Sequence, residues 1–337
     1  MPKKVSLKIK VFATFLIIAL CFIVGEIYVR SLGHKPFTQK YSTSPKKEYF
    51  AFDPIIGWVP KPGVYQYPSP DSKLGLITTT ILPDKSRKSQ PNPDKNQESE
   101  IWFLGGSYTQ GEGVSDKDTF IWKLQEQHPE YHFKNFGVGG HGTVQSYLFL
   151  KKLLENSAPP KEVLYGFLTH HEVRNSANLL WLKMTTEVSA KNKKVLLPYC
   201  LPKQNGTFDC NHIAQYPRMF GDTTSALLNF LKEHIYRIQH RQINQSARQI
   251  TQETIRKMHT LCQEKNIKFT VFFYDLFEQE DLLNYEEYLK SHHIPFINIA
   301  HSYLYNQKFT VRNDGHPNPK LHDIYKEKFE KFYFVDE

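Results

Sequence analysis

Residues 101–114 read IWFLGGSYTQGEGV, and this stretch decides the fold. Its apolar run at 101–106 predicts a short buried strand ending in glycines, and TFIWKLQEQH at 119–128 predicts a helix. This alternation of strand and helix recurs along the chain. It is interrupted after the third strand, where the sequence shows no regular pattern until about residue 222. Further strands are predicted at 133–140, 163–169, 268–274 and 295–300, and further helices at 144–156, 247–265 and 282–292. Strands that alternate with helices indicate a parallel sheet covered by helices on both faces.

Ser107 directly follows the first predicted strand and its two glycines. In parallel sheets, active residues gather at the carboxyl ends of strands. A serine there is well placed as a nucleophile, because its own backbone N–H can stabilise an oxyanion. A phosphate-binding glycine loop and an ordinary turn are the alternatives. The stretch lacks the lysine of the phosphate loop, the G-x-G-x-x-G spacing and the G-x-S-x-G elbow.

A catalytic serine needs a base, and one of the fifteen histidines stands out. His316 lies in VRNDGHPNPKLH, after the last predicted strand, and Asp314 precedes it by two residues. A nearby carboxylate can orient an imidazole and stabilise its cation. An Asp-Gly turn with an exposed histidine is the alternative.

Glycines also follow the second predicted strand, in NFGVGGHGTVQ at 135–145. Without side chains, their backbone N–H groups can approach a ligand closely, which is the second requirement of an oxyanion hole. Close packing of helix against strand is the alternative.

Together these blocks resemble the SGNH/GDSL hydrolase superfamily. The nucleophile block of that family, GDSxTxG, is matched by GSYTQG at 106–111, with Gly105 expected where the Asp would be. Its N-x-G-x-x-G block matches Asn135, Gly137 and Gly140, and its last block, an Asp shortly before His-Pro, matches Asp314, His316 and Pro317. The three blocks follow in the right order over about residues 101–325.

Two departures bear on the site. Where the family usually has Asp-x-x-His, position 313 is Asn, so the orienting acid is expected to be Asp314. The third family block, usually Gly-x-Asn-Asp, is absent. His171 and Asn175 are the candidate side-chain oxyanion donors in its place, and Arg174 could bind an anionic substrate. No metal is expected, because adjacent histidines at a strand end point apart.

The resemblance implies a three-layer α/β/α domain with a flavodoxin-like parallel sheet over residues 101–337. Ser107 would attack an acyl carbonyl, His316 would carry the proton, Asp314 would hold His316, and the amides of Ser107 and Gly140 would receive the oxyanion. No cofactor is implied. The expected substrate is an O-acetyl ester on an envelope or exported glycan, with hydrolysis and acyl transfer both open. A lipase or thioesterase, and a non-catalytic carbohydrate-binding or assembly protein, are the alternatives.

The amino terminus predicts a membrane anchor at residues 1–30. Four lysines precede an uncharged apolar run from Val11 to Gly25. Residues 7–29 would extend about 34 Å as a helix, enough to span a bilayer of about 30 Å. No small-x-small cleavage site follows, which favours an uncleaved anchor over a removed signal peptide, and Leu20 before Cys21 disfavours a lipoprotein. The lysines place the amino end in the cytoplasm and the body in the periplasm or another extracytoplasmic space.

Residues 31–100 are expected to form a polar tether and a turn-rich extension, with an exposed loop at 83–99. Cys200 and Cys210 bracket an Asn205-Gly206 turn dipeptide, so a disulfide and two free thiols are both open, while Cys262 is expected to be buried.

The composition is that of a globular protein, with 40% hydrophobic and 23% charged residues. The formal charge is +9, but residues 1–35 hold six Lys/Arg and one Glu, which leaves 37 Lys/Arg against 33 Asp/Glu, or +4, for the rest. Because no nucleic-acid motif accompanies this excess, we expect no nucleic-acid partner.

Overall fold

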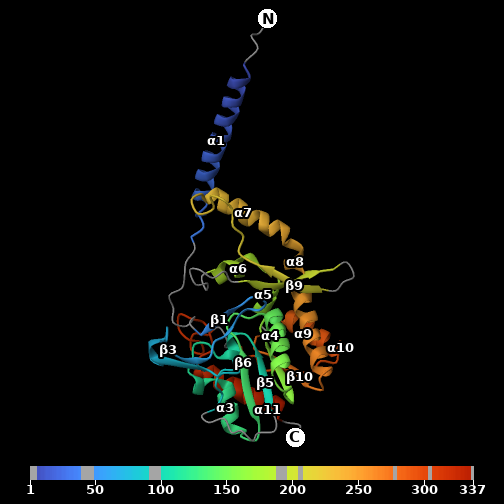
Figure 1. The fold of residues 1–337 in the computed structure, drawn as a ribbon. Coiled ribbons are helices and arrows are strands. Elements are labelled where there is room, and N and C mark those ends of the chain that lie inside the picture. Colours follow the sequence, from blue (N-terminus) through green and yellow to red (C-terminus); the bar gives the residue numbers. More distant parts are fainter. Residues whose placement is uncertain are drawn as a thin grey trace.

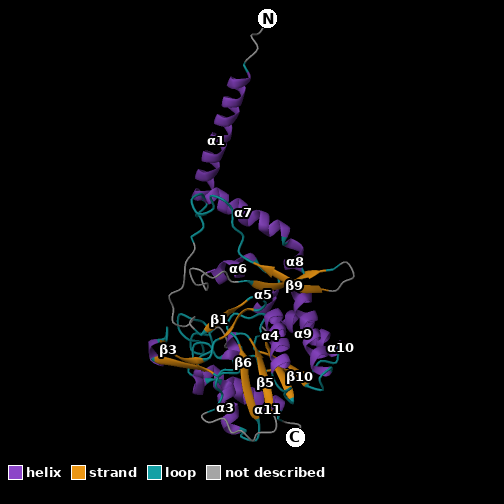
Figure 2. Cartoon of the chain, viewed as in Figure 1, coloured by secondary structure: helices purple, strands orange, loops and turns teal. Residues whose placement is uncertain are grey.

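A five-stranded parallel sheet forms the centre of the molecule (Figures 1 and 2). The computed structural model describes residues 6–38, 49–90, 100–186, 196–203, 208–275, 279–302 and 306–334. The strands lie in the order β11-β10-β7-β5-β6, and every neighbouring pair is parallel. Read from the other edge, this is the flavodoxin-like order 2-1-3-4-5, as predicted. The strand bounds are β5 Glu100–Gly105, β6 His132–Gly137, β7 Glu162–Phe167, β10 Lys268–Phe273 and β11 Phe296–Asn298.

Helices cover both faces of this sheet and complete the three-layer α/β/α arrangement. One face packs against α4 Thr143–Asn156, α9 Ala247–Gln263 and α10 Gln279–Ser291, and the other packs against α3 Phe120–Gln127 and α11 Pro319–Tyr333. Strand β5 shows why both faces of the sheet are covered. Its Trp102 and Leu104 point to the first layer, while Ile101 and Phe103 point to the second. Each fully buried side chain of this kind contributes roughly 1.5–3 kcal/mol.

The predicted strands and helices of this core are confirmed to within three residues at each end. The region expected to be irregular up to residue 222 contains regular elements as well, and two helices that the sequence pattern did not single out follow it. These elements are α5 His170–Asn175, α6 Leu179–Thr186, the hairpin of β8 Leu197–Pro202 and β9 Phe208–Ala214, α7 Ala226–Gln239 and α8 Arg241–Gln245.

A disulfide joins Cys200 of β8 to Cys210 of β9. The Asn205-Gly206 dipeptide lies outside the described residues. Cys262 is buried in α9, as predicted, and burial raises the pKa of its thiol to about 12.

The segment before the sheet forms two antiparallel pairs, β1 Phe50–Asp53 with β2 Gly57–Pro60 and β3 Gly63–Pro68 with β4 Leu76–Ile81. The prediction of an exposed loop at 83–99 is wrong for its described part, since Ser86, Arg87, Ser89 and Gln90 are buried. The reason is that Arg87 N donates to Asn135 O at 2.7 Å, which ties this segment to the edge strand β6. Residues 91–99 lie outside the described residues.

At the amino end, α1 Leu7–Ser31 projects from the body as one long helix (Figure 1). It is the one helix in the described ranges that is long and apolar enough to cross a membrane.

Candidate active site

Ser107 is the first residue of a short helix, α2 Ser107–Gln110, which starts where β5 ends. The sheet order reverses between β5 and β7, and such a switch point opens a crevice at the carboxyl ends of the strands. Ser107 itself is buried, with 3% of its surface exposed. The structure therefore places the predicted nucleophile where open α/β sheets bind ligands.

Gly105 and Gly106 permit this turn. Gly105 has a φ of +152°, and a Cβ there would lie 2.3 Å from Thr109 Oγ1 and 2.8 Å from Gly166 O. At Gly106, a Cβ would lie 2.8 Å from His171 Nε2 and 3.2 Å from an Arg174 guanidinium nitrogen. Gly106, and not Gly105 as predicted, directly precedes the serine and so stands at the position of the Asp in GDSxTxG. His171 and Arg174 occupy the space that a side chain would need.

Asp314 and His316 lie together in the loop between β11 and α11. The His316 Nδ1 atom is hydrogen-bonded to Asp314 Oδ1. A tight turn holds the pair, because Val311 N donates to His316 O at 2.7 Å and Asp314 N donates to Val311 O at 3.2 Å. His316 keeps 22% of its side chain exposed and Asp314 keeps 9%. This is the pairing expected of a base and its orienting acid.

The nucleophile loop and the histidine loop meet, although more than two hundred residues separate them in sequence. The rings of Tyr108 and His316 have centroids 5.8 Å apart, and the Tyr108 hydroxyl donates to Gly315 O at 3.5 Å. A Cβ on Gly113 would lie 3.2 Å from Val311 and 3.6 Å from the Cβ of His316. Ser107 and the pair of Asp314 and His316 thus share one end of the sheet.

Glu112 is a site residue that sequence reasoning missed. Its Oε2 atom lies 3.7 Å from Nε2 of His316, and its backbone N–H donates to Ser107 O at 2.9 Å. The same oxygen would lie 2.7 Å from a Cβ on Gly139, so a glycine there makes room for the carboxylate. A glutamate between two glycines carries no pattern that could have identified it.

Arg87, also missed, holds the nucleophile loop from behind. This buried guanidinium pairs with Asp116 at 2.8 Å. It also donates to the carbonyls of Gln110, Gly111 and Val114, at 3.0, 2.6 and 2.8 Å. Since Asn135 of the second family block donates to Thr109 O at 3.0 Å, two side chains fix the course of the loop.

Gly140 follows β6 and has a φ of +80°. A Cβ there would lie 2.8 Å from Trp58 and 3.4 Å from Trp181. Before it, Gly139 N donates to the Gln110 side chain at 2.8 Å. The glycine block therefore packs against the nucleophile helix and two tryptophans.

The two predicted side-chain oxyanion donors differ in place and in what they can donate: His171 Nε2 lies beside Gly106, whereas Asn175 lies beside Gly142. Asn175 is buried, with Oδ1 accepting from Val144 N at 3.0 Å and Nδ2 donating to Thr251 at 2.8 Å, so it supports the start of α4. In His171, Nδ1 pairs with the Tyr165 hydroxyl at 2.8 Å. That hydroxyl donates to Thr143, so the neutral ring bears its proton on Nδ1 and a lone pair on Nε2. Burial keeps the ring neutral by lowering the pKa of His171 well below its usual value.

Arg174 brings a positive charge next to Gly106, the residue before Ser107. Its guanidinium donates to His141 O at 2.7 Å and lies over the Trp181 ring at 4.7 Å. Burial lowers its pKa to about 10, which leaves it charged at neutral pH. The nearby charge of Glu112 acts on Arg174, but within the described ranges no carboxylate lies within 4.0 Å of it, so an anionic group on a ligand would find a cation without a direct ion-pair partner.

The arrangement suits acyl transfer by a serine. In the part of the chain that the structure describes, no three His, Cys, Asp or Glu side chains lie close enough to hold a metal ion.

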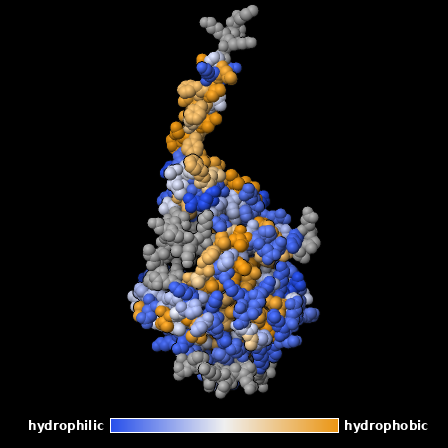
Figure 3. Space-filling model, in the orientation of Figure 1, coloured by the Kyte–Doolittle hydropathy of each residue, from blue (hydrophilic) through white to orange (hydrophobic). Residues whose placement is uncertain are grey.

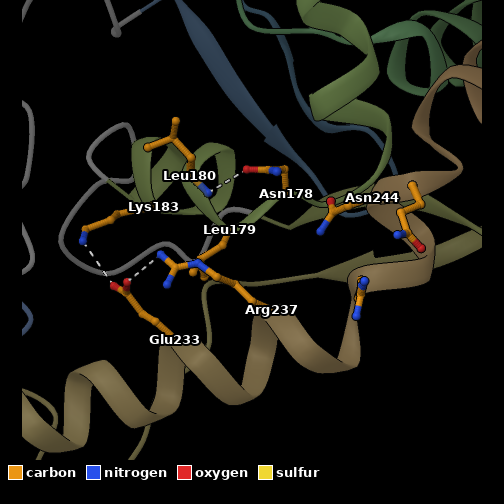
Figure 4. Close-up of a pocket in the computed structure, with 9 residues that line it drawn as sticks. Asn178, Leu179, Leu180, Lys183, Glu233, Arg237 and Asn244 are labelled. Carbon is orange, nitrogen blue, oxygen red and sulfur yellow. Dashed lines mark hydrogen bonds and ion pairs between the residues drawn. The ribbon is translucent and has the colours of Figure 1, made fainter.

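A cavity of about 500 Å³ lies between α6, α7 and α8, and none of the site residues named above lines it (Figure 4).

No protein-family model matches the chain, and no curated protein matches it. Among solved structures, a lipolytic protein of the G-D-S-L family from Veillonella parvula DSM 2008 is 11% identical, with a TM-score of 0.41, over 70% of this chain and 99% of that one. A psychrotrophic esterase from Pseudoalteromonas sp. is 11% identical, with a TM-score of 0.41, over 69% of this chain and 96% of that one. An acetyl xylan esterase from Butyrivibrio proteoclasticus is 11% identical, with a TM-score of 0.41, over 77% of this chain and 72% of that one. These three solved structures are thus a GDSL-family lipolytic protein and two esterases.

Proposed function

We propose that this protein is a serine-dependent ester hydrolase or acyltransferase. Ser107 Oγ attacks the acyl carbonyl while His316 takes the serine proton, and Asp314 stabilises the imidazolium. As the ester C–O bond breaks, His316 returns that proton to the leaving alcohol, and an acyl-serine remains. Water or another hydroxyl then attacks the acyl-serine, with His316 again as base. The observation that carries the proposal is the contact between the His316 ring and Tyr108, the neighbour of Ser107.

The oxyanion would be held by the backbone N–H groups of Ser107 and Gly140. Ser107 is the first residue of α2, and Gly140 lies in the loop between β6 and α4. Arg174 is the side chain that we assign to this role. His171 presents a lone pair toward Gly106, and the amide of Asn175 is engaged elsewhere. An arginine donor with no paired carboxylate would stabilise developing negative charge, or would hold an anionic group of the substrate.

The substrate class follows from the proposed compartment. Residues 7–29 would anchor the chain with the amino end in the cytoplasm and the body outside, and a disulfide such as Cys200–Cys210 suits an oxidising space. A body held there meets envelope and exported glycans. O-acetyl esters on such glycans are the substrate that we propose.

The test is acylation of Ser107. Purified full-length protein in detergent should hydrolyse p-nitrophenyl acetate and react with a fluorophosphonate probe, and Ser107→Ala should abolish both. Ser157→Ala, at an exposed helix end, is the matched control and should behave as wild type. Labelling that persists in Ser107→Ala would assign the chemistry to another residue. No labelling and no turnover in the wild type would favour a non-catalytic carbohydrate-binding protein. Acetate release from acetylated polysaccharides, with and without a glycan acceptor, then separates hydrolysis from transfer.

A further inference from the structure

The helix α7 carries an apolar stripe on the face that points away from the body. Leu231, Ile235 and Ile238 are 40%, 46% and 64% exposed, and their spacing of four and three residues puts them on one side of the helix. Asn229, Lys232 and Tyr236, about a third of a turn away, are buried, as is Ala226 at the start of the helix. Amphipathic helices of globular domains turn the apolar side inward, so α7 is inverted relative to that rule.

The amino end of α7 is fixed to the foot of α1. Both carboxylate oxygens of Glu26 in α1 accept hydrogen bonds from the start of α7, from Ser225 Oγ at 2.7 Å, Ala226 N at 2.9 Å and Leu227 N at 2.8 Å. Farther along, the Asn229 side chain donates to Lys35 O at 2.9 Å. Figure 1 shows α7 running sideways from the lower end of α1.

The exposed apolar residues of α1 indicate how deep in a membrane this junction of α1 and α7 would lie. Ile23, Ile27 and Tyr28 are 54%, 63% and 63% exposed, so the apolar surface of α1 continues past Glu26. If α1 crosses a membrane, the edge of the hydrocarbon region falls at about the level at which α7 begins. Phe220, just before α7, is 99% exposed, and Figure 3 shows hydrophobic surface both along α1 and where the body meets it.

Charged residues lie on the side of α7 that faces α6. Arg237 and Arg241 of the α7–α8 segment line the cavity of about 500 Å³ together with Lys183. Figure 4 shows Lys183 and Arg237 both directed toward Glu233, the one carboxylate that lines this cavity. A helix with an exposed apolar face and charged residues on the side toward the body has the pattern of an interfacial membrane helix.

We propose that the outer face of α7 lies in the interface of the bilayer that α1 crosses, with Leu231, Ile235 and Ile238 among the lipid chains. This proposal rests on the proposed anchoring through residues 7–29. The membrane would then hold the body in one orientation, through α1 and α7 together, rather than leave it to swing on a single helix.

Fluorescence quenching by brominated lipid tests this placement in the full chain. Single cysteines at Leu231, Ile235 or Ile238 in a Cys21→Ala background would carry an environment-sensitive dye, since Cys262 is buried and Cys200 and Cys210 are joined. The vesicles contain phosphatidylcholine and phosphatidylglycerol, with part of the phosphatidylcholine brominated, at about one chain per vesicle. Phe332→Cys, at an exposed apolar residue on α11, is the control, and dye on native Cys21 reports on α1 itself.

We expect blue-shifted emission and strong quenching at the three α7 positions and at Cys21, and neither at position 332. Quenching at Cys21 without quenching on α7 would overturn the α7 proposal and leave the anchor in place. Blue-shifted emission on α7 without quenching would overturn it, because the stripe would then be covered by the protein itself and not by lipid. Absence of quenching at Cys21 would remove the anchor, and the α7 proposal with it, without touching the esterase proposal.

Discussion

At the residue scale, the proposed chemistry depends on Asp314, the acid that holds His316. Asp314→Asn keeps the shape of the side chain but removes the charge that fixes the imidazole tautomer and stabilises its cation. We expect turnover of p-nitrophenyl acetate to fall by roughly 10³–10⁴-fold. The unfolding midpoint should stay near that of the wild type. Steady-state kinetics and thermal unfolding of the same preparation measure both.

The neighbouring Asn313 is the natural control for that experiment. It occupies the position of the Asp in the family pattern, and its φ of +62° is a conformation that glycine adopts freely. Asn313→Gly should therefore leave turnover within a few-fold of wild type. If Asn313→Gly removes activity and Asp314→Asn does not, the orienting group has been assigned to the wrong residue.

A second acid, Asp275, makes stability depend on pH. It is fully buried after β10 and accepts hydrogen bonds from Thr169, and burial raises the pKa of its carboxyl from 3.8 to about 7. Between these two values the folded protein keeps a proton that the unfolded chain has lost. The free energy of unfolding should therefore fall as pH rises from about 4 to about 7, by up to about 1.4 kcal/mol per pH unit from this group.

Asp275→Asn isolates that contribution, because its amide cannot titrate. Urea unfolding of both proteins at pH 5 and pH 7.5 gives the comparison. We expect the wild type to lose more stability than the variant over this interval. Equal losses would show that the Asp275 carboxyl titrates below the interval.

At the scale of elements, the nucleophile loop depends on a side chain from outside the sheet. Arg87→Met should cost roughly 3–5 kcal/mol, because it leaves the buried Asp116 carboxylate without its partner and frees three loop carbonyls. Turnover should fall with it, since Ser107 begins the same loop. Chemical denaturation measures the loss. The adjacent Lys88→Met is the control, and a similar cost for the two variants would mean that Arg87 does not support the loop.

Arg87 also shows where sequence reasoning ends at this scale. The core strands could be predicted, because burial on both faces gives them continuous apolar runs such as KFTVFF in β10. Arg87 lies in a polar, proline-containing stretch that resembles a surface loop, and only tertiary contacts with carbonyls far along the chain bury it. The position of Glu112 beside His316, and that of His171 and Arg174 beside Gly106, likewise depend on tertiary contacts between distant parts of the chain.

The helix α7 marks a different limit. Its apolar residues recur at helical spacing, but the pattern cannot say which side faces the body. The buried residues are Ala226, Asn229, Lys232 and Tyr236, of which Lys232 pairs with the buried Asp222 at 2.9 Å. A reading of periodicity alone would have placed Leu231 and Ile235 in a core. The inversion is visible only once the body is folded.

At the scale of the whole molecule, Glu26 joins the anchor to the body. Its carboxylate accepts from the first two backbone N–H groups of α7, which no residue of that helix can satisfy. Glu26→Ala should therefore open the first turn of α7 by about 1–2 kcal/mol, which corresponds to about tenfold faster amide exchange. Hydrogen-exchange mass spectrometry over residues 225–230 measures this, with Glu155→Ala, at an exposed end of α4, as the control. Unchanged exchange in Glu26→Ala would mean that the two helices are joined by the chain after α1 and not by this carboxylate.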